Sequence, residues 1–188
     1  MRRFSEIEAS WNRDIDITDK VAAELGQKGE EAVINFFRSI SPRIEIRKSS
    51  SKEDAGRDAT FSPKTIDSVV YIDGEPGLAP QISVSKNPKV RKEKFEQLKN
   101  RPFLRLDEMR NTDTAIPAGV ILLEQEDIEK GRPVDKQILQ DTLNSLRFDL
   151  TQTKNPKEID KVKKTIALFE NIQSNFDQKK RASPSITN

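Results

Sequence analysis

Apolar residues recur at helical spacing along the first part of the chain. They stand at Ile17, Val21, Ala22, Leu25, Ala32, Val33, Phe36, Phe37 and Ile40. Steps of three and four residues place such side chains on one helix face, and Ser41-Pro42 is predicted to end the helix. Gly26 and Gly29 separate two halves of the pattern, which fits either two short helices or one helix with a weak joint. Residues 1–15 are mostly polar, with Trp11 as an anchor, and are expected to form a short arm or helix.

A stretch of strand patterns follows this helix. Polar and apolar residues alternate over 43–47, and similar signals predict strands over 57–61, 68–73 and 81–85. The sequence Asp73-Gly74-Glu75-Pro76-Gly77 predicts a turn that joins the last two strands in a hairpin. The apolar run over 118–123 is typical of a strand covered on both faces. Helices are predicted between these strands, over 88–100 and 103–110.

Two amphipathic helices close the chain. Asn155 is a favourable N-cap, Pro156 suits the first helical position, and Glu158 completes a capping box for the second of them. The short connection predicts an antiparallel helical hairpin. Phe148 lies off the apolar stripe of the first helix, so it belongs either to a two-sided core helix or to a contact with a partner. The stripes consist of Val134, Ile138, Leu139, Leu143, Leu146 and Leu150, and of Ile159, Val162, Ile166, Phe169, Ile172 and Phe176.

This order of elements predicts an α/β (α+β) fold. We expect a central mixed β-sheet of about four to five strands, flanked by helices, with a C-terminal antiparallel helical hairpin. The expected divisions are a polar arm (1–15), an α/β core (16–128), the hairpin (129–178) and a disordered basic tail (179–188).

The composition restricts the chemistry that is available. The chain has no cysteine and no histidine, which excludes disulfides, zinc, haem and iron–sulfur ligation, and histidine-based nucleophile systems. A bound metal would have to be a hard cation held by oxygen ligands. No apolar run is long enough to span a membrane and no secretory signal is recognisable, so a cytoplasmic location is expected, with export by a signal-free route left open.

Charge is unevenly distributed although the net charge is only +2. Residues 86–110 carry nine Lys or Arg residues against four acids. This stretch either contacts phosphates or forms an ordinary solvated helix face. The residues expected to bind nucleic acid are Lys86, Lys89, Arg91, Lys92 and Lys94.

Three short segments carry the candidate chemistry, namely Gly29-Glu30-Glu31, Gly56-Arg57-Asp58 and Pro80-Gln81-Ile82-Ser83. With the helix–strand–strand–strand–helix–strand order of residues 28–125, they resemble the PD-(D/E)xK (restriction-endonuclease-like) nuclease superfamily. The resemblance implies a Mg²⁺ site, with Mn²⁺ as a substitute, that cleaves phosphodiesters of DNA or RNA. Such chemistry needs no histidine, because a hard cation polarises the phosphate and activates water.

The resemblance assigns roles to individual residues. Glu30, Asp58 and Gln81 would hold the metal; Glu31 is the alternative helix acid, although it points away from the apolar face, and Asp73 is the alternative to Asp58. A family lysine falls at Ser83, which is a departure from the pattern. Asp58, Gln81, Ser83 and Lys86 are therefore the candidate catalytic residues, although strand alternation places Lys86 on the face of Ile82 and Val84.

Two functions follow from these observations. The first is a divergent metal-dependent nuclease-like domain that acts on or binds nucleic acid. The second is a non-enzymatic adaptor or effector-type protein on a pseudo-nuclease scaffold, which would bind a protein partner through its C-terminal hairpin.

Overall fold

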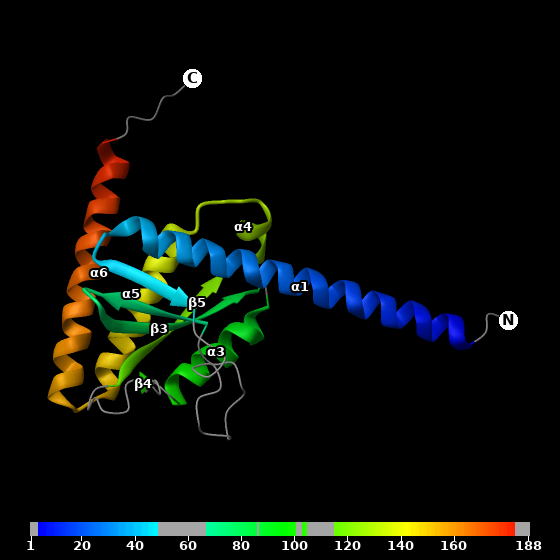
Figure 1. The fold of residues 1–188 in the computed structure, drawn as a ribbon, viewed down its shortest axis with the longest axis horizontal. Helices are drawn as coiled ribbons and strands as arrows, with labels where there is room; N and C mark the ends of the chain where they lie inside the picture. The colour runs from blue at the N-terminus through cyan, green and yellow to red at the C-terminus, as the bar shows by residue number, and fades with distance from the viewer. Residues whose placement is uncertain (1–3, 49–66, 86, 101–102, 105–114, 183–188) are drawn as a thin grey trace.

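The protein is a mixed β-sheet flanked by helices (Figure 1). The computed structural model describes residues 4–48, 67–85, 87–100, 103–104 and 115–182. The architecture confirms the α/β (α+β) class and the sheet of about four to five strands predicted from the sequence. In the described part of the chain, no helix is both long and apolar enough to cross a bilayer.

The five strands lie in the order β1-β2-β3-β5-β4. Strands β1, β2 and β3 are antiparallel neighbours, whereas β5 runs parallel to β3 and β4 runs antiparallel to β5. The strands are β1 (Ile44–Lys48), β2 (Ser68–Ile72), β3 (Glu75–Val84), β4 (Phe103–Leu104) and β5 (Ile116–Leu123). The helices are α1 (Phe4–Ile40), α3 (Pro88–Asn100), α4 (Gln125–Glu129), α5 (Asp135–Gln152) and α6 (Pro156–Ala182).

Helix α1 is continuous over 37 residues, so the two glycines do not divide it. The residues expected to form an N-terminal arm are helical from Phe4 onward, and this half of α1 projects away from the rest of the protein (Figure 1). Gly29 lies where the helix crosses the sheet. A Cβ atom there would stand 2.2 Å from Cγ2 of Val84, so the missing side chain permits the close approach of helix and strand.

The two faces of the sheet are covered by different helices. On one face, which we call the α1 face, Ile46, Leu78 and Ile121 pack with side chains of α1, α5 and α6. On the other, the α3 face, Val120 and Leu122 pack with Leu98 of α3. Because both faces are covered, every residue of β5 is buried, as its continuous apolar run predicts.

Aromatic contacts join α1 and α6 over the α1 face. The ring centroids of Phe37 and Phe169 are 5.9 Å apart in an edge-on arrangement, and those of Phe36 and Phe176 are 6.3 Å apart. The apolar stripe of the C-terminal hairpin therefore belongs to the protein's own core. Phe148 packs against the α3 face, which makes α5 a two-sided core helix.

Helix α5 also covers the open edge of β5. Strand β4 pairs only with Ile116 and Pro117 of β5, so the edge beyond them has no neighbouring strand in the described residues. There the Val120 N–H donates to Oγ of Ser145 at 3.1 Å, and the Leu122 N–H donates to Oδ2 of Asp141 at 2.9 Å. These polar side chains satisfy backbone donors that would otherwise be buried without partners.

Asp149 continues the line of Asp141 and Ser145 along α5, four residues further on. It is 0% exposed, and in the described part of the protein neither of its carboxyl oxygens has a hydrogen-bond partner. Burial raises the pKa of Asp149 from its ordinary 3.8 to about 9. The residue is therefore a neutral acid at neutral pH.

The connection between α5 and α6 uses the predicted cap with one change. Oδ1 of Asn155 accepts the Lys157 N–H at 3.0 Å, which confirms the N-cap. Glu158 accepts a hydrogen bond from the Thr153 hydroxyl, and the Asn155 N–H donates to that same hydroxyl oxygen at 3.1 Å. Thr153 thus relays the contact that a capping box would make directly.

Several boundaries differ from the prediction. Strand β3 begins at Glu75, six residues before the predicted start, because its Gly and Pro residues resemble a turn in the sequence. Residues 103–104 form a strand rather than the start of a helix. Helix α6 continues to Ala182, into the expected tail. The strand predicted over 57–61 lies outside the described residues, and α4 was not predicted.

We expect Gly29→Ala to lower the free energy of unfolding by about 1–3 kcal/mol, because the new methyl group would displace the stiff Val84 side chain. This cost exceeds the ~1 kcal/mol that alanine gains over glycine in helix propensity. Gly26→Ala is the matched control, since a Cβ there would meet nothing within 4 Å, and it should raise stability by about 0.5–1 kcal/mol. Urea unfolding of both variants measures the two changes; a gain in both would contradict the steric constraint.

Ionisation of Asp149 should make stability fall as pH rises. Between about pH 4 and pH 9 the unfolded chain binds fewer protons at this residue than the folded protein, because the folded pKa is the higher one. Asp149→Asn cannot ionise, so its stability relative to the parent should grow by up to about 1.4 kcal/mol per pH unit in this window. Unfolding curves at several pH values measure this difference. A pH profile for Asp149→Asn that is identical to the parent's would contradict the assignment.

Candidate functional site

The candidate residues gather at one end of the sheet, which we call the carboxyl end. It is defined by Lys48 at the end of β1, Asp67 before β2, Val84 at the end of β3 and Leu123 at the end of β5. Lys48 pairs with Ser68, and Val84 pairs with Leu123 in the parallel register. In open sheets with parallel strands, ligands commonly bind beyond the carboxyl ends of the strands.

Glu30 reaches the carboxyl end from α1. Its Oε2 lies 3.2 Å from Nζ of Lys48, the last residue of β1, and its side chain is 33% exposed. Glu31 is exposed and accepts a hydrogen bond from the Gln27 side chain at 2.9 Å. Of the two acids that the sequence left open, Glu30 is the one that this structure pairs with a residue of the carboxyl end.

Gln81 and Ser83 lie on β3 close to its carboxyl end. Gln81 is 8% exposed and pairs with Val120, while Ser83 pairs with Leu122. Ile82 and Val84 pack into the core of the α1 face, so strand alternation directs Gln81 and Ser83 toward the α3 face. Glu30 and Gln81 therefore approach the carboxyl end from opposite faces of the sheet.

Asp67 is a candidate that the sequence reasoning missed. Its Oδ2 accepts the backbone N–H of Ile82 at 2.5 Å, and its own N–H donates to the Pro80 carbonyl at 3.3 Å. Beyond the irregularity at Val70, continuing the β2–β3 register places Asp67 opposite Gln81. Pairing the residues of the two strands outward from the Asp73-Gly74 turn places Asp67 next to Gln81. The register of the predicted hairpin could therefore have identified Asp67 from the sequence.

Asp73, the alternative to Asp58, lies at the opposite end of the sheet. It occupies the turn between β2 and β3 with a φ of 52°, and Gly74 follows with a φ of 84°. Arg43 donates to its Oδ1 from Nε at 2.9 Å and to its Oδ2 from Nη2 at 2.5 Å. This bidentate pair lowers the pKa of Asp73 below its usual value. Asp73 is thus a turn residue, distant from Gln81.

Asp58 and Lys86 lie outside the described residues. The residues on either side of the segment 49–66, Lys48 and Asp67, both belong to the carboxyl end. Likewise Ser85 and Asn87, on either side of Lys86, follow directly after β3. The Ser85 N–H donates to the Leu123 carbonyl at 3.1 Å, which fixes this point of the chain to the carboxyl end.

Helix α3 begins at the carboxyl end. Oδ1 of Asn87 accepts the Lys89 N–H at 2.9 Å, and Oγ of Ser85 accepts the Asn87 N–H at 3.0 Å. The first turn contains no acid, while Lys89 and Lys92 are exposed and Lys94 is half-buried. The position of the Arg91 side chain is outside the described part. Lysines and the positive end of the helix dipole favour an anion here.

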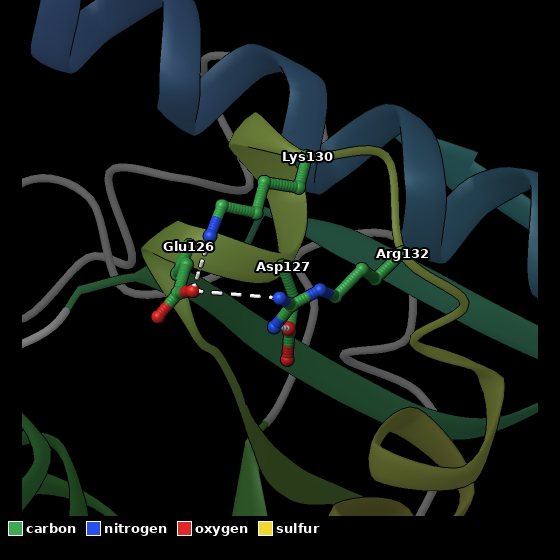
Figure 2. A network of polar contacts seen from close by, with 4 residues as sticks. All are labelled: Glu126, Asp127, Lys130 and Arg132. Carbon is green, nitrogen blue, oxygen red and sulfur yellow. Dashed lines mark hydrogen bonds and ion pairs between the residues drawn. The ribbon is translucent and has the colours of Figure 1, made fainter.

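Four charged residues around α4 form an exposed network beside α1 (Figure 2). Glu126 lies 2.6 Å from Lys130 and 3.5 Å from Arg132, and Asp127 lies 3.2 Å from Arg132. The Arg132 N–H also donates to the Asp127 carbonyl at 2.8 Å, and the preceding Gly131 has a φ of 61°, which is a Schellman helix end. Both acids are matched by cations, so the network closes the helix and adds no net charge.

The described residues do not complete a carboxylate metal site. Among them, no three acidic side chains come close enough together to hold a metal ion. Asp67, which precedes β2, and Gln81 on the adjacent β3 supply two oxygen-bearing side chains, and Glu30 supplies a third near the opposite face. A further carboxylate would come from outside the described residues, where Asp58 is the candidate identified from the sequence.

No protein-family model matches the chain, and no curated protein or solved structure is significantly similar to it. The function is therefore inferred from the chemistry of the residues at the carboxyl end.

Proposed function

We propose that the protein is a divergent metal-dependent nuclease-like domain that binds the phosphodiester backbone of DNA or RNA at the carboxyl end of its sheet. One observation carries the proposal, the contact between the Asp67 carboxylate and the Ile82 N–H beside Gln81. This contact fixes the Asp67 carboxylate to the backbone of β3 at the residue that follows Gln81. It lies at the end of the sheet where the segment containing Asp58 begins and ends and where α3 starts.

The chemistry of these side chains suits a hard cation. Asp58, Asp67 and Gln81 would hold Mg²⁺ or Mn²⁺ through oxygen atoms, the ligands that such ions prefer. Asp67 takes the place of Glu30 in this set, because Glu30 pairs with Lys48 and approaches from the opposite face of the sheet. When bound, the metal supplies charge that polarises a phosphate and lowers the pKa of water. Because one Asp67 oxygen accepts a backbone hydrogen bond, its carboxylate is held in a fixed orientation.

Ser83 limits the catalytic power of the proposed site. A serine hydroxyl has no charge with which to stabilise a pentavalent phosphate, whereas the lysine of the resembled family would carry one. Lys86 follows two residues after β3 and is the nearest lysine in sequence. We therefore propose that the site binds the nucleic-acid backbone but cleaves it slowly. Lys86 is the residue proposed to support this cleavage.

The alternative function, protein binding through the hairpin, has less support. The apolar stripes of α5 and α6 are buried in the protein's own core. Their outer faces are charged and carry pairs such as Arg147 with Glu170 at 2.8 Å. No observation specific to the hairpin favours a protein partner over the basic start of α3 as a contact surface.

Calorimetric titration with Mg²⁺ and Mn²⁺ tests the metal site. We expect Asp58→Ala and Asp67→Asn each to weaken binding by about tenfold or more, a change of ~1.4 kcal/mol. Asparagine at position 67 keeps an oxygen that can accept the Ile82 N–H, so the variant removes charge with little effect on the fold. Asp73→Asn is the matched control at the opposite end and should bind as the parent does. Absence of binding at millimolar metal, or equal binding by all variants, would contradict the proposal.

Salt-dependent binding of labelled DNA and RNA tests the role of α3. Lys89→Gln and Lys92→Gln should each weaken binding of any sequence and reduce the slope of log K against log salt concentration by about one, because each removes one phosphate contact. Fluorescence anisotropy at several salt concentrations measures both quantities. Lys163→Gln, an exposed change on α6, is the control for total charge; an equal effect there would indicate non-specific attraction.

A further inference from the structure

A groove lies between α6 and the turn that joins β2 to β3. Its volume is about 670 Å³, within the range of small-molecule sites. Because the β2–β3 turn is remote from the carboxyl end, the groove is separate from the proposed nucleic-acid site. Its apolar lining comes from Ile72 and Pro76 on the strands and from Leu168 on α6.

Glycine at position 77 shapes the floor of the groove. A Cβ atom there would lie 2.7 Å from Cδ1 of Ile72 and 3.7 Å from Oγ1 of Thr165. The strand can therefore approach α6 closely at this point. The Thr165 hydroxyl donates to the Lys161 carbonyl at 3.0 Å, so it is already used within the helix.

Two ion pairs contribute to the lining of the groove. Arg43 binds both carboxylate oxygens of Asp73, and Nζ of Lys164 lies 2.7 Å from Oδ2 of Asp160. In each pair the charges cancel locally. These four residues therefore leave little net charge for a ligand.

Lys161 differs from the other cations of the groove. Its side chain is half-buried, and among the described residues none accepts a hydrogen bond from its ammonium group. Burial lowers the pKa of Lys161, and the attraction of Glu75 offsets part of this effect. An ammonium group carries three hydrogen-bond donors, so the groove contains donors without protein acceptors.

The stem of Lys161 covers apolar surface of the groove, as lysine stems commonly do. Partial burial of a cation costs free energy, and the fold recovers no hydrogen bond at this position. Methionine at this position would cover the same apolar surface without placing a cation in the groove. Proteins retain groups that lower stability where function requires them, and an anionic ligand in the groove would give the Lys161 ammonium a hydrogen-bond partner.

We propose that the groove binds a small molecule that carries a carboxylate or phosphate on an apolar body, with Lys161 as the residue that holds the anionic group. The apolar body lies against Ile72 and Leu168, and the anion accepts hydrogen bonds from the Lys161 ammonium. Charge-assisted bonds of this kind are the stronger class of hydrogen bond. Glu75 disfavours ligands that carry several negative charges near the strand side of the groove.

The test is a titration of the ¹⁵N-labelled full chain followed by NMR. The probes are hexanoate, its uncharged counterpart hexanamide, acetate and inorganic phosphate. We expect hexanoate to shift the amide signals of Gly77 and Leu168 saturably, and hexanamide to bind about tenfold more weakly because it lacks the charge. Acetate and inorganic phosphate lack the apolar chain of hexanoate. Their affinities therefore measure what a carboxylate or a phosphate contributes without an apolar body.

Substitutions of the two lysines of the groove test which of them binds the carboxylate of hexanoate. Lys161→Met should weaken hexanoate binding by about tenfold or more, while its melting temperature stays equal to or above that of the parent. Lys164→Met removes a neighbouring lysine of the same groove and should retain binding. Lys161→Arg keeps the charge and should bind hexanoate if the site is as proposed. Absence of saturable shifts at millimolar probe, or equal binding by parent and Lys161→Met, would overturn the proposal.

Discussion

The pairing of β5 determines how the rest of the protein is arranged. A strand buried on both faces must satisfy its backbone groups within the protein, because water cannot reach them. Strand β3 satisfies one side of β5 along six paired residues, and in the described part of the chain β4 pairs with only the beginning of the other side. Helix α5 takes over where β4 ends, with Ser145 and Asp141 as acceptors. The position of α5, and with it that of α6, follows from this requirement.

Much of the fold could be predicted from periodicity and capping residues. The strands β1 and β2 and the helices α3, α5 and α6 are close to their predicted ranges, because each has a clear period and recognisable end signals. The first half of β3 was missed because Pro76, Gly77 and Pro80 resemble turn residues. Its place beside β2 and β5 depends on partners that are distant in sequence, and a local pattern cannot contain that information.

The polar residues of α5 are a second case in which a local sequence pattern does not predict the environment of a residue. Asp141, Ser145 and Asp149 lie at helical spacing, and a sequence pattern assigns such residues to solvent. They are buried because the sheet leaves an open strand edge beside them, which depends on the strand order. The candidate site was affected similarly: Gln81 and Ser83 were recognised by a local motif, whereas Asp67 acquires its significance only from the strand opposite.

The covering of the β5 edge by α5 also bears on how the protein behaves at high concentration. An uncovered strand edge is a template on which another chain can add a strand, and such addition initiates ordered aggregates. Here the donors of Val120 and Leu122 are occupied by side chains of a helix that belongs to the same core. Intermolecular strand addition at this side would first require α5 to leave the core, at the cost of exposing its apolar residues. Resistance to aggregation at β5 is thus coupled to the stability of the whole domain.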